Sequence, residues 1–336
     1  MKLQSRVYKK IGGFALMLGA LFFAAGTEMV RQNISPNHTL RVSVETIPYI
    51  QAHEHPEGDP DAPHAHWYSS PKAVLVPFDM WVTSIRAVVE NASPGILHHI
   101  LLYEAGAQNP ICPNTFRKIR ELFAASRNTV HDPVIFDEPY SIYLKEGTSL
   151  VVDAMEHTAF PPEGPGGIYT NVEIAVELDY IPAKYAKERT QKLEFYRLRL
   201  DDSPCSYPIL HEAFVVPKGK GVFVKKPDTK NVFDGGWYRF EKPGNIIGFG
   251  ANFWPWKGGK VVHAVLNGKE VASLTALKLS DAWAWSIPQH NISVRIEKGD
   301  IIEAYAEYEN PYTDKDILDA SGMLGFYFAP RDKVSE

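Results

Sequence analysis

KVVHAVLNGKEVASL, at residues 260–274, consists of two short apolar runs joined by Asn267-Gly268. Asn-Gly between alternating apolar residues is the strongest short-range signal of a two-residue β-hairpin. Further along, GDIIEAYAEYEN at 299–310 alternates apolar and polar residues, as a strand with one buried face does. This part of the chain is therefore predicted to be antiparallel β-structure.

Similar short segments, rich in β-branched residues and partly alternating, begin at Lys72 and run through most of the chain, separated by Pro, Gly, Asn and Asp. Short β-branched runs with turn residues at such spacing are typical of antiparallel β-sandwiches. A polar, charged stretch at 181–192 divides them into two series. We therefore expect an all-β fold with two tandem antiparallel, jelly-roll-like sandwiches, at 71–186 and 187–336. The stretch PNTFRKIRELFAASR, at 113–127, is the exception and predicts a short helix.

The charge balance argues against nucleic acid as a partner. The 336 residues include 35 Lys and Arg and 40 Asp and Glu, which gives a formal net charge of −5. Such a chain has no basic surplus to neutralise phosphates. The sequence also contains no nucleotide-binding glycine loop, no GxSxG of a serine hydrolase and no HExxH of a zinc protease. Those common templates are therefore excluded.

The two cysteines, Cys112 and Cys205, do not form a CxxC pair, so a thiolate zinc site is excluded. One disulfide between them and two free thiols both remain open, because sequence cannot place the two Cα atoms within bridging range.

The N-terminus carries a hydrophobic segment. Ile11–Thr27 is uncharged and mostly apolar, and Arg6, Lys9 and Lys10 precede it. A run of this length is at the short limit for crossing a bilayer, and basic residues before it orient the start of the chain toward the cytoplasm. Residues 1–32 are thus predicted to be a cytoplasmic stub and a single-pass anchor in the inner membrane, with the bulk of the chain in the periplasm.

A cleaved signal peptide is the alternative, with Ala24-Ala25-Gly26 as a loose cleavage site. Residues 33–70, which follow, are polar and rich in turn formers. They contain two HxH pairs, which could bind copper or zinc. A solvated loop is the simpler interpretation of this segment. The four histidines are His53, His55, His64 and His66.

His98 and His99 lie inside a strand-like run, Ile96–Tyr103. Adjacent residues of a strand point to opposite faces of the sheet, so the pair can share one metal only if the strand twists or bulges there. Two separate histidines, half-exposed or buried, are the default interpretation.

The run containing this pair, GILHHILLYEAG at 95–106, resembles the HHMLL strand of the copper type II, ascorbate-dependent monooxygenases, the family of peptidylglycine α-hydroxylating monooxygenase and dopamine β-monooxygenase. LKEGTSLVVDAMEH at 144–157 resembles the strand that supplies that family's third histidine. PGNIIGFGANFWPWKGGKVV at 243–262 and SGMLGFYFA at 321–329 resemble the segments of the second copper site. The resemblance covers roughly residues 70–330, in the same order.

This resemblance implies two β-sandwiches that each carry one copper and face each other across a solvent-filled cleft. The ligands of the first copper correspond to His98, His99 and His157, all present. Neutral imidazoles suit copper, and three of them leave one coordination position open.

The second copper site needs His-x-His and a methionine. Met323 matches the methionine, as a weak and vestigial ligand, but Trp254 and Trp256 stand where the two histidines would be. An indole N–H has no lone pair for a metal. The family's reaction centre is therefore expected to be absent, so no catalytic residue is assigned. The two tryptophans are expected to fill the pocket or to form a contact surface.

Together these features predict a non-catalytic, membrane-anchored accessory subunit of a larger membrane complex, of photosynthetic reaction-centre/light-harvesting or respiratory type. Its expected partners are the membrane, through residues 11–27, and other membrane-protein subunits. No cofactor is expected, with copper possible at His98, His99 and His157. A mononuclear copper oxidoreductase using these histidines and a periplasmic copper-binding protein using the HxH pairs are the alternatives.

Overall fold

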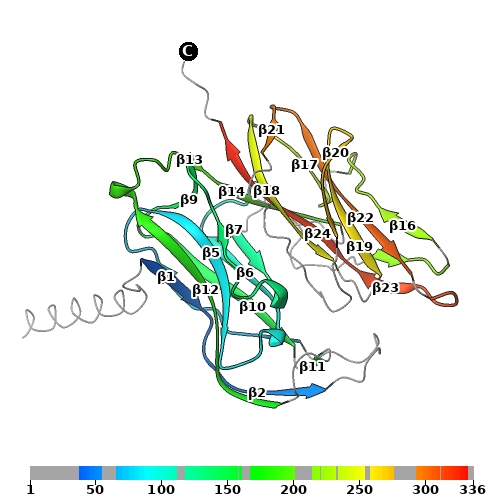
Figure 1. Cartoon of the computed structure of the whole chain (residues 1–336), viewed down its shortest axis with the longest axis horizontal. Helices are drawn as coiled ribbons and strands as arrows, with labels where there is room; N and C mark the ends of the chain where they lie inside the picture. The colour runs from blue at the N-terminus through cyan, green and yellow to red at the C-terminus, as the bar shows by residue number, and fades with distance from the viewer. Residues whose placement is uncertain are drawn as a thin grey trace, which may run out of the picture.

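The computed structural model is all-β (Figure 1). In the residues that it describes, the chain forms 24 strands and three single-turn 3₁₀ helices. The described residues are 38–54, 66–111, 118–157, 159–160, 167–200, 214–219, 221–231, 234–253, 258–275, 293–310 and 312–331.

The first half of the chain builds two sheets that pack on each other. The larger has the order β11-β2-β12-β5-β9-β13, with β1 beside β12 and β8 beside β5. The smaller has the order β3-β10-β6-β7, with β4 beside β10. The elements are β1 (Thr39–Ser43), β2 (Ile47–Glu54), β3 (His66–Tyr68), β4 (Ala73–Leu75), β5 (Met80–Glu90), η1 (Pro94–Ile96), β6 (Leu97–Ala105), β7 (Ile119–Ala125), η2 (Arg127–Thr129), β8 (Val134–Ile135), β9 (Tyr140–Leu144), β10 (Ser149–His157), β11 (Ala159–Phe160), β12 (Gly167–Pro182), η3 (Ala183–Tyr185) and β13 (Gln191–Lys192).

The second half repeats this sandwich arrangement. A sheet of order β14-β24-β18-β21 and a sheet of order β16-β22-β19-β20, with β17 beside β22, enclose a second hydrophobic core; β15 and β23 form a separate pair. The strands are β14 (Glu194–Arg199), β15 (Phe214–Val216), β16 (Val222–Lys225), β17 (Trp237–Arg239), β18 (Gly244–Phe253), β19 (Gly259–Leu266), β20 (Lys269–Thr275), β21 (Val294–Ile296), β22 (Ile301–Glu309), β23 (Ile317–Ala320) and β24 (Gly322–Pro330).

The Asn267-Gly268 hairpin is confirmed. β19 ends at Leu266, β20 begins at Lys269, and the two turn residues have φ of 50° and 81°. Two consecutive positive φ angles give the turn a backbone twist that matches the twist of the strands, and Asn and Gly adopt them at little cost.

The polar segment 33–70 contributes strands to the first sandwich, which corrects the expectation of a solvated loop. β1 pairs along its whole length with β12, and β2 pairs with the beginning of β12. Leu40, Val42 and Val44 are at most 2% exposed and belong to the first core. The few apolar residues of this segment alternate, so one face of the strand is buried although its composition is polar.

The helix expected at 113–127 is also corrected, because residues 119–125 form β7. This strand pairs with β6, from Ile100 opposite Ala125 to Ala105 opposite Ile119. Its residues Leu122–Ala125 are buried. Tertiary pairing with an adjacent strand outweighs the modest helix propensity of this sequence.

In the part of the chain that the structure describes, no helix has both the length and the apolar character that a membrane span requires. The predicted anchor, Ile11–Thr27, lies outside the described residues.

Candidate functional site

β6 contains a β-bulge at His98. Met155 of β10 pairs with His99, but the next residue of β10, Glu156, pairs with Leu97. His98 is therefore the extra residue of β6 at this point of the ladder. A bulge of this kind bends the strand and changes the direction of the side chains around it.

The bulge brings both imidazoles to one face of the sheet. Leu97 and Ile100 are both fully buried in the first core. They are three positions apart instead of the two that regular alternation requires. The residues between them, His98 and His99, therefore share the opposite face. Their Nδ1 atoms are 3.0 Å apart, with the rings inclined at 73°.

This arrangement fits either a hydrogen-bonded pair or two ligands of one metal. At 3.0 Å a protonated Nδ1 of one ring can donate to the other ring. Two nitrogens bound to a tetrahedral metal at about 2.0 Å would be separated by about 3.3 Å. The condition for a shared metal, a bulged strand, is thus met at the His98-His99 pair.

The third predicted ligand, His157, is the last residue of β10. It lies two residues beyond Met155, which pairs with His99 across the sheet. The structure therefore brings the backbone at position 157 beside the beginning of β6; the His157 side chain is not among the described parts. Within those parts, no three His, Cys, Asp or Glu side chains gather closely enough to hold a metal ion.

A buried carboxyl group lies next to this site. Glu156 is only 2% exposed, and the Ser69 hydroxyl donates a hydrogen bond to it. Burial raises the pKa of Glu156 to about 7, because desolvation disfavours the charged form. Sequence reasoning missed this residue, although alternation along SLVVDAMEH places it on the same face as Leu150, Val152 and Ala154.

The structure places Met323 beside a positive charge. The Arg197 Nη1 atom is 3.8 Å from the Met323 sulfur, and Nη2 of the same guanidinium is 2.7 Å from Glu121 Oε1. Met323 is 5% exposed. A permanently charged guanidinium at this distance opposes a metal cation on the same sulfur. The residues around Met323 therefore do not fit a copper ion.

Arg197 also connects the two halves of the molecule. It lies on β14 of the second sandwich, whereas Glu121 lies on β7 of the first (Figure 1). Nearby, the Tyr327 hydroxyl of β24 donates to the Leu122 carbonyl of β7 at 3.3 Å. Leu122 is the extra residue of a second bulge, since Leu102 pairs with Phe123 and Tyr103 pairs with Glu121.

The Tyr327 ring belongs to the first core although β24 is a strand of the second sandwich. It packs against Phe136 and Phe195, with ring centroids 4.9 and 5.0 Å apart. We call the contacts of Arg197 with Glu121 and of Tyr327 with Leu122 the seam between the sandwiches. Neither contact was anticipated from the sequence, because each depends on how the two sandwiches dock.

Several predicted residues cannot be placed. Trp254, Trp256, Cys112 and Cys205 lie outside the described residues, as do His55 and His64 of the HxH pairs. The backbone of His53 is described in β2, and that of His66 in β3.

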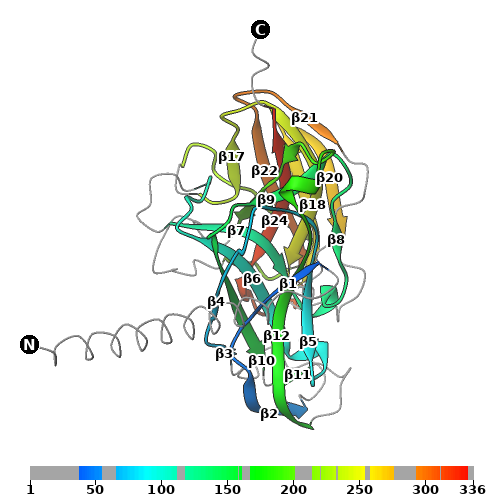
Figure 2. The ribbon, with the colours of Figure 1, turned by 90° about the vertical axis from the view of Figure 1, so that its left-hand side faces the viewer.

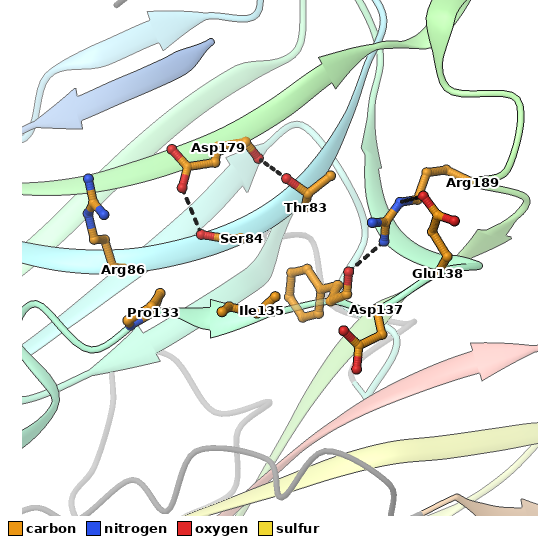
Figure 3. A pocket seen from close by; sticks show the side chains of 10 residues that line it. Thr83, Ser84, Arg86, Pro133, Ile135, Asp137, Glu138, Asp179 and Arg189 are labelled. Carbon is orange, nitrogen blue, oxygen red and sulfur yellow. Dashed lines mark hydrogen bonds and ion pairs between the residues drawn. The ribbon is translucent and has the colours of Figure 1, made fainter. Parts of the chain in front are cut away.

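A groove of about 500 Å³ on the first sandwich is lined by β5, β8, β12 and the chain before β13 (Figure 3). Its polar groups are paired within the chain. Asp179 accepts hydrogen bonds from Thr39 at 2.7 Å and from Ser84 at 2.9 Å. Arg189 Nη1 donates to the carbonyls of Phe136 and Tyr140 at 2.5 and 2.6 Å. These bonds fix the loops to the sheet, so the groove is a structural feature.

No protein-family model matches the chain, and no curated protein matches it. Similar solved structures include the major capsid protein P2 from bacteriophage PM2, with 8% identity and a TM-score of 0.35 over 88% of this chain and 99% of that one. A peptide-N(4)-(N-acetyl-β-D-glucosaminyl) asparagine amidase has 10% identity and a TM-score of 0.36 over 86% and 96%. The STIV MCP has 10% identity and a TM-score of 0.33 over 88% and 99%. Likenesses this remote carry no argument about function.

Proposed function

We propose that this chain is a non-catalytic, membrane-anchored accessory subunit of a larger membrane complex, built on two tandem jelly-roll-like sandwiches that resemble the copper monooxygenases. The observation that carries the proposal is the position of Arg197, whose guanidinium contacts both Met323 and Glu121. In the family, the corresponding methionine faces a metal and a solvent-filled cleft.

The charge on Arg197 works against the family's chemistry in two ways. It opposes a second metal ion at Met323, and its ion pair with Glu121 ties the two sandwiches together near that sulfur. Oxygen activation by a second copper then has no site. A rigid body without a reaction centre is suited to a supporting role beside other subunits.

Exposed apolar side chains on the second sandwich support docking. Val222 and Val224 lie on β16, an edge strand, and are 61% and 39% exposed. Val215 on β15 and Leu318 on β23 are 44% and 61% exposed. Edge strands with exposed apolar residues favour pairing with another protein. We infer that they contact neighbouring membrane subunits of photosynthetic reaction-centre/light-harvesting or respiratory type, with the anchor at residues 11–27 holding the periplasmic body close to them.

The test is purification of the tagged full chain from its native membranes in mild detergent. We expect other membrane-protein subunits to co-purify in fixed stoichiometry. The Val222→Lys, Leu318→Lys variant should lose them, whereas the control Leu75→Lys, which changes a side chain 62% exposed on the first sandwich, should keep them. Recovery of the wild-type chain alone, or ascorbate-dependent hydroxylation of a peptide or amine, would refute the proposal.

A second candidate function, copper binding at the first site, is favoured by the bulge at His98. His98 and His99 offer two imidazoles on one face, and His157 is the candidate third ligand. A bound copper ion would supply one-electron redox chemistry or simple metal storage. Metal analysis of the purified protein tests this candidate, because the His98→Asn, His99→Asn variant should lose copper that the wild type retains.

A further inference from the structure

The register of β3, β10 and β6 brings a fourth histidine to the first site. These strands run side by side in one sheet, with β10 in the middle (Figure 2). His157 of β10 pairs directly with His66 of β3. Two residues back, Met155 of β10 pairs with His99 of β6. Two distant parts of the sequence, the end of the HxH segment and the His98-His99 pair, thus lie on either side of β10.

The four positions share one face of this sheet. Directly paired residues, and residues two apart along a strand, lie on the same face. Positions 66 and 157 therefore share the face of Met155, which is the face of His99. The bulge turns His98 to this face as well. The outer strands are two strand spacings apart, about 10 Å, so a metal above the middle strand can be approached from both sides.

We propose that His66 and His157 join His98 and His99 in one four-imidazole site for a first-row divalent metal, Cu(II) or Zn(II). Imidazole nitrogen suits both ions, and Cu(II) binds such nitrogen sets most tightly in the divalent series. The proposal rests on the second candidate function and extends it with a ligand from the N-terminal part of the chain. Unlike three imidazoles, four leave no open position in a four-coordinate shell.

A closed shell has a structural consequence. Closed metal sites stabilise a fold, whereas catalytic sites keep a position for water or substrate. β3 is three residues long and lies at the end of its sheet, where β10 is its only neighbour in the sheet order of the described strands. A metal shared by His66 and the other three histidines would fasten this short strand to the first sandwich, in agreement with a non-catalytic role.

The experiment uses the full chain in detergent, stripped with EDTA and titrated with Cu(II) or Zn(II). We expect one ion per chain and an electron paramagnetic resonance spectrum of Cu(II) with four nitrogen ligands. His66→Asn should give three nitrogens and at least tenfold weaker binding. The control is His263→Asn, which changes a strand histidine of the second sandwich that is paired with Glu270 and Glu307 at 2.7 and 3.2 Å and should not affect binding.

Histidine footprinting by diethylpyrocarbonate on the wild-type chain keeps the proposal testable if the variant fails to fold. Metal should protect His66 and His99 together, whereas His98, which is only 5% exposed, is shielded from the reagent in either state. A three-nitrogen site that is indifferent to His66 would overturn this inference and leave the copper-binding candidate standing. No binding at all would overturn both. The accessory role is decided separately, by the co-purification.

Discussion

The Arg197 guanidinium on β14 lies 2.7 Å from the Glu121 carboxylate on β7, so an ion pair joins the two sandwiches. The two side chains are only 11% and 15% exposed. A pair so withdrawn from water depends on both partners being present, because each charge offsets the cost of removing the other from water. The same guanidinium contacts the Met323 sulfur. The side chain that joins the two sandwiches therefore also makes this sulfur unsuitable for binding a metal ion.

Removing one partner of this pair should destabilise the protein strongly. We expect Glu121→Gln to lower the free energy of unfolding by about 3 kcal/mol, since it removes the carboxylate charge that faces the Arg197 guanidinium in a pair withdrawn from water. The double variant Arg197→Met, Glu121→Leu should recover most of this loss, because both charges of the pair are then replaced by apolar side chains. Urea denaturation monitored by tryptophan fluorescence measures both.

The exposed pair of Arg295 and Glu297 is the matched control. Their side chains are 73% and 56% exposed, with 2.7 Å between them. Arg295→Ala should leave the free energy of unfolding nearly unchanged, because water and salt screen an exposed pair. An equal effect of Arg295→Ala and Glu121→Gln would show that the seam pair has no special role.

Loss of the Tyr327 hydroxyl should destabilise the seam. Tyr327→Phe leaves the Leu122 carbonyl, the extra acceptor of the second bulge, without this donor. We expect a cost of about 1–2 kcal/mol. Tyr305→Phe is the control, because that hydroxyl is part-buried and bonds to Glu303 of the same strand; its cost should be smaller. Thermal unfolding of the wild type and the two variants measures these costs. A Tyr327→Phe variant as stable as the wild type would contradict the prediction.

Glu156 should make stability fall as pH rises. Its pKa is about 7 in the folded chain against an ordinary value of 4.5, so between these pH values the unfolded chain releases a proton that the folded chain retains. Below pH 4.5 the carboxyl is neutral in both the folded and the unfolded chain, so its burial carries no cost from ionisation. Above pH 7 it is ionised in both, and this lowers the free energy of unfolding by about 3 kcal/mol.

Glu156→Gln should remove this dependence in metal-free protein and raise stability at pH 8 but not at pH 4. The control Glu90→Gln has the opposite sign. The hydrogen bond from Arg41 lowers the pKa of Glu90, so ionised Glu90 stabilises the fold at pH values above its unfolded pKa. Glu90→Gln should therefore lower stability at pH 8. Denaturant midpoints measured from pH 4 to pH 8 test both. A parallel pH profile for wild type and Glu156→Gln would show that the buried carboxyl does not titrate as stated.

The N-terminal segment should remain attached to the mature protein. We expect the chain to stay in the membrane fraction after a high-salt wash, because apolar burial holds Ile11–Thr27 in the bilayer independently of charge. Deletion of residues 1–32 should release the protein. N-terminal sequencing that begins near residue 26 or 27 would instead identify a cleaved signal peptide.

The all-β class follows from short-range features of the sequence. Alternation in residues 299–310 and Asn-Gly at 267–268 each specify local geometry whatever the rest of the chain does, and β22 and the β19–β20 hairpin form there. The run Ile96–Tyr103 likewise lies largely in a strand, β6. Side-chain period and turn chemistry are properties of neighbouring residues, so a sequence reveals them directly.

Where a segment belongs, and which way its side chains face, was decided by tertiary structure. Residues 119–125 form a strand because β6 offers a partner, and β1 is drawn into the first sandwich by β12. The bulge at His98 exists only relative to β10, where one residue of that strand accounts for two of β6. The pairing of His66 with His157 and of Arg197 with Glu121 likewise joins residues far apart in sequence. Local propensity is weak beside packing and register, which depend on partners that no single stretch of sequence contains.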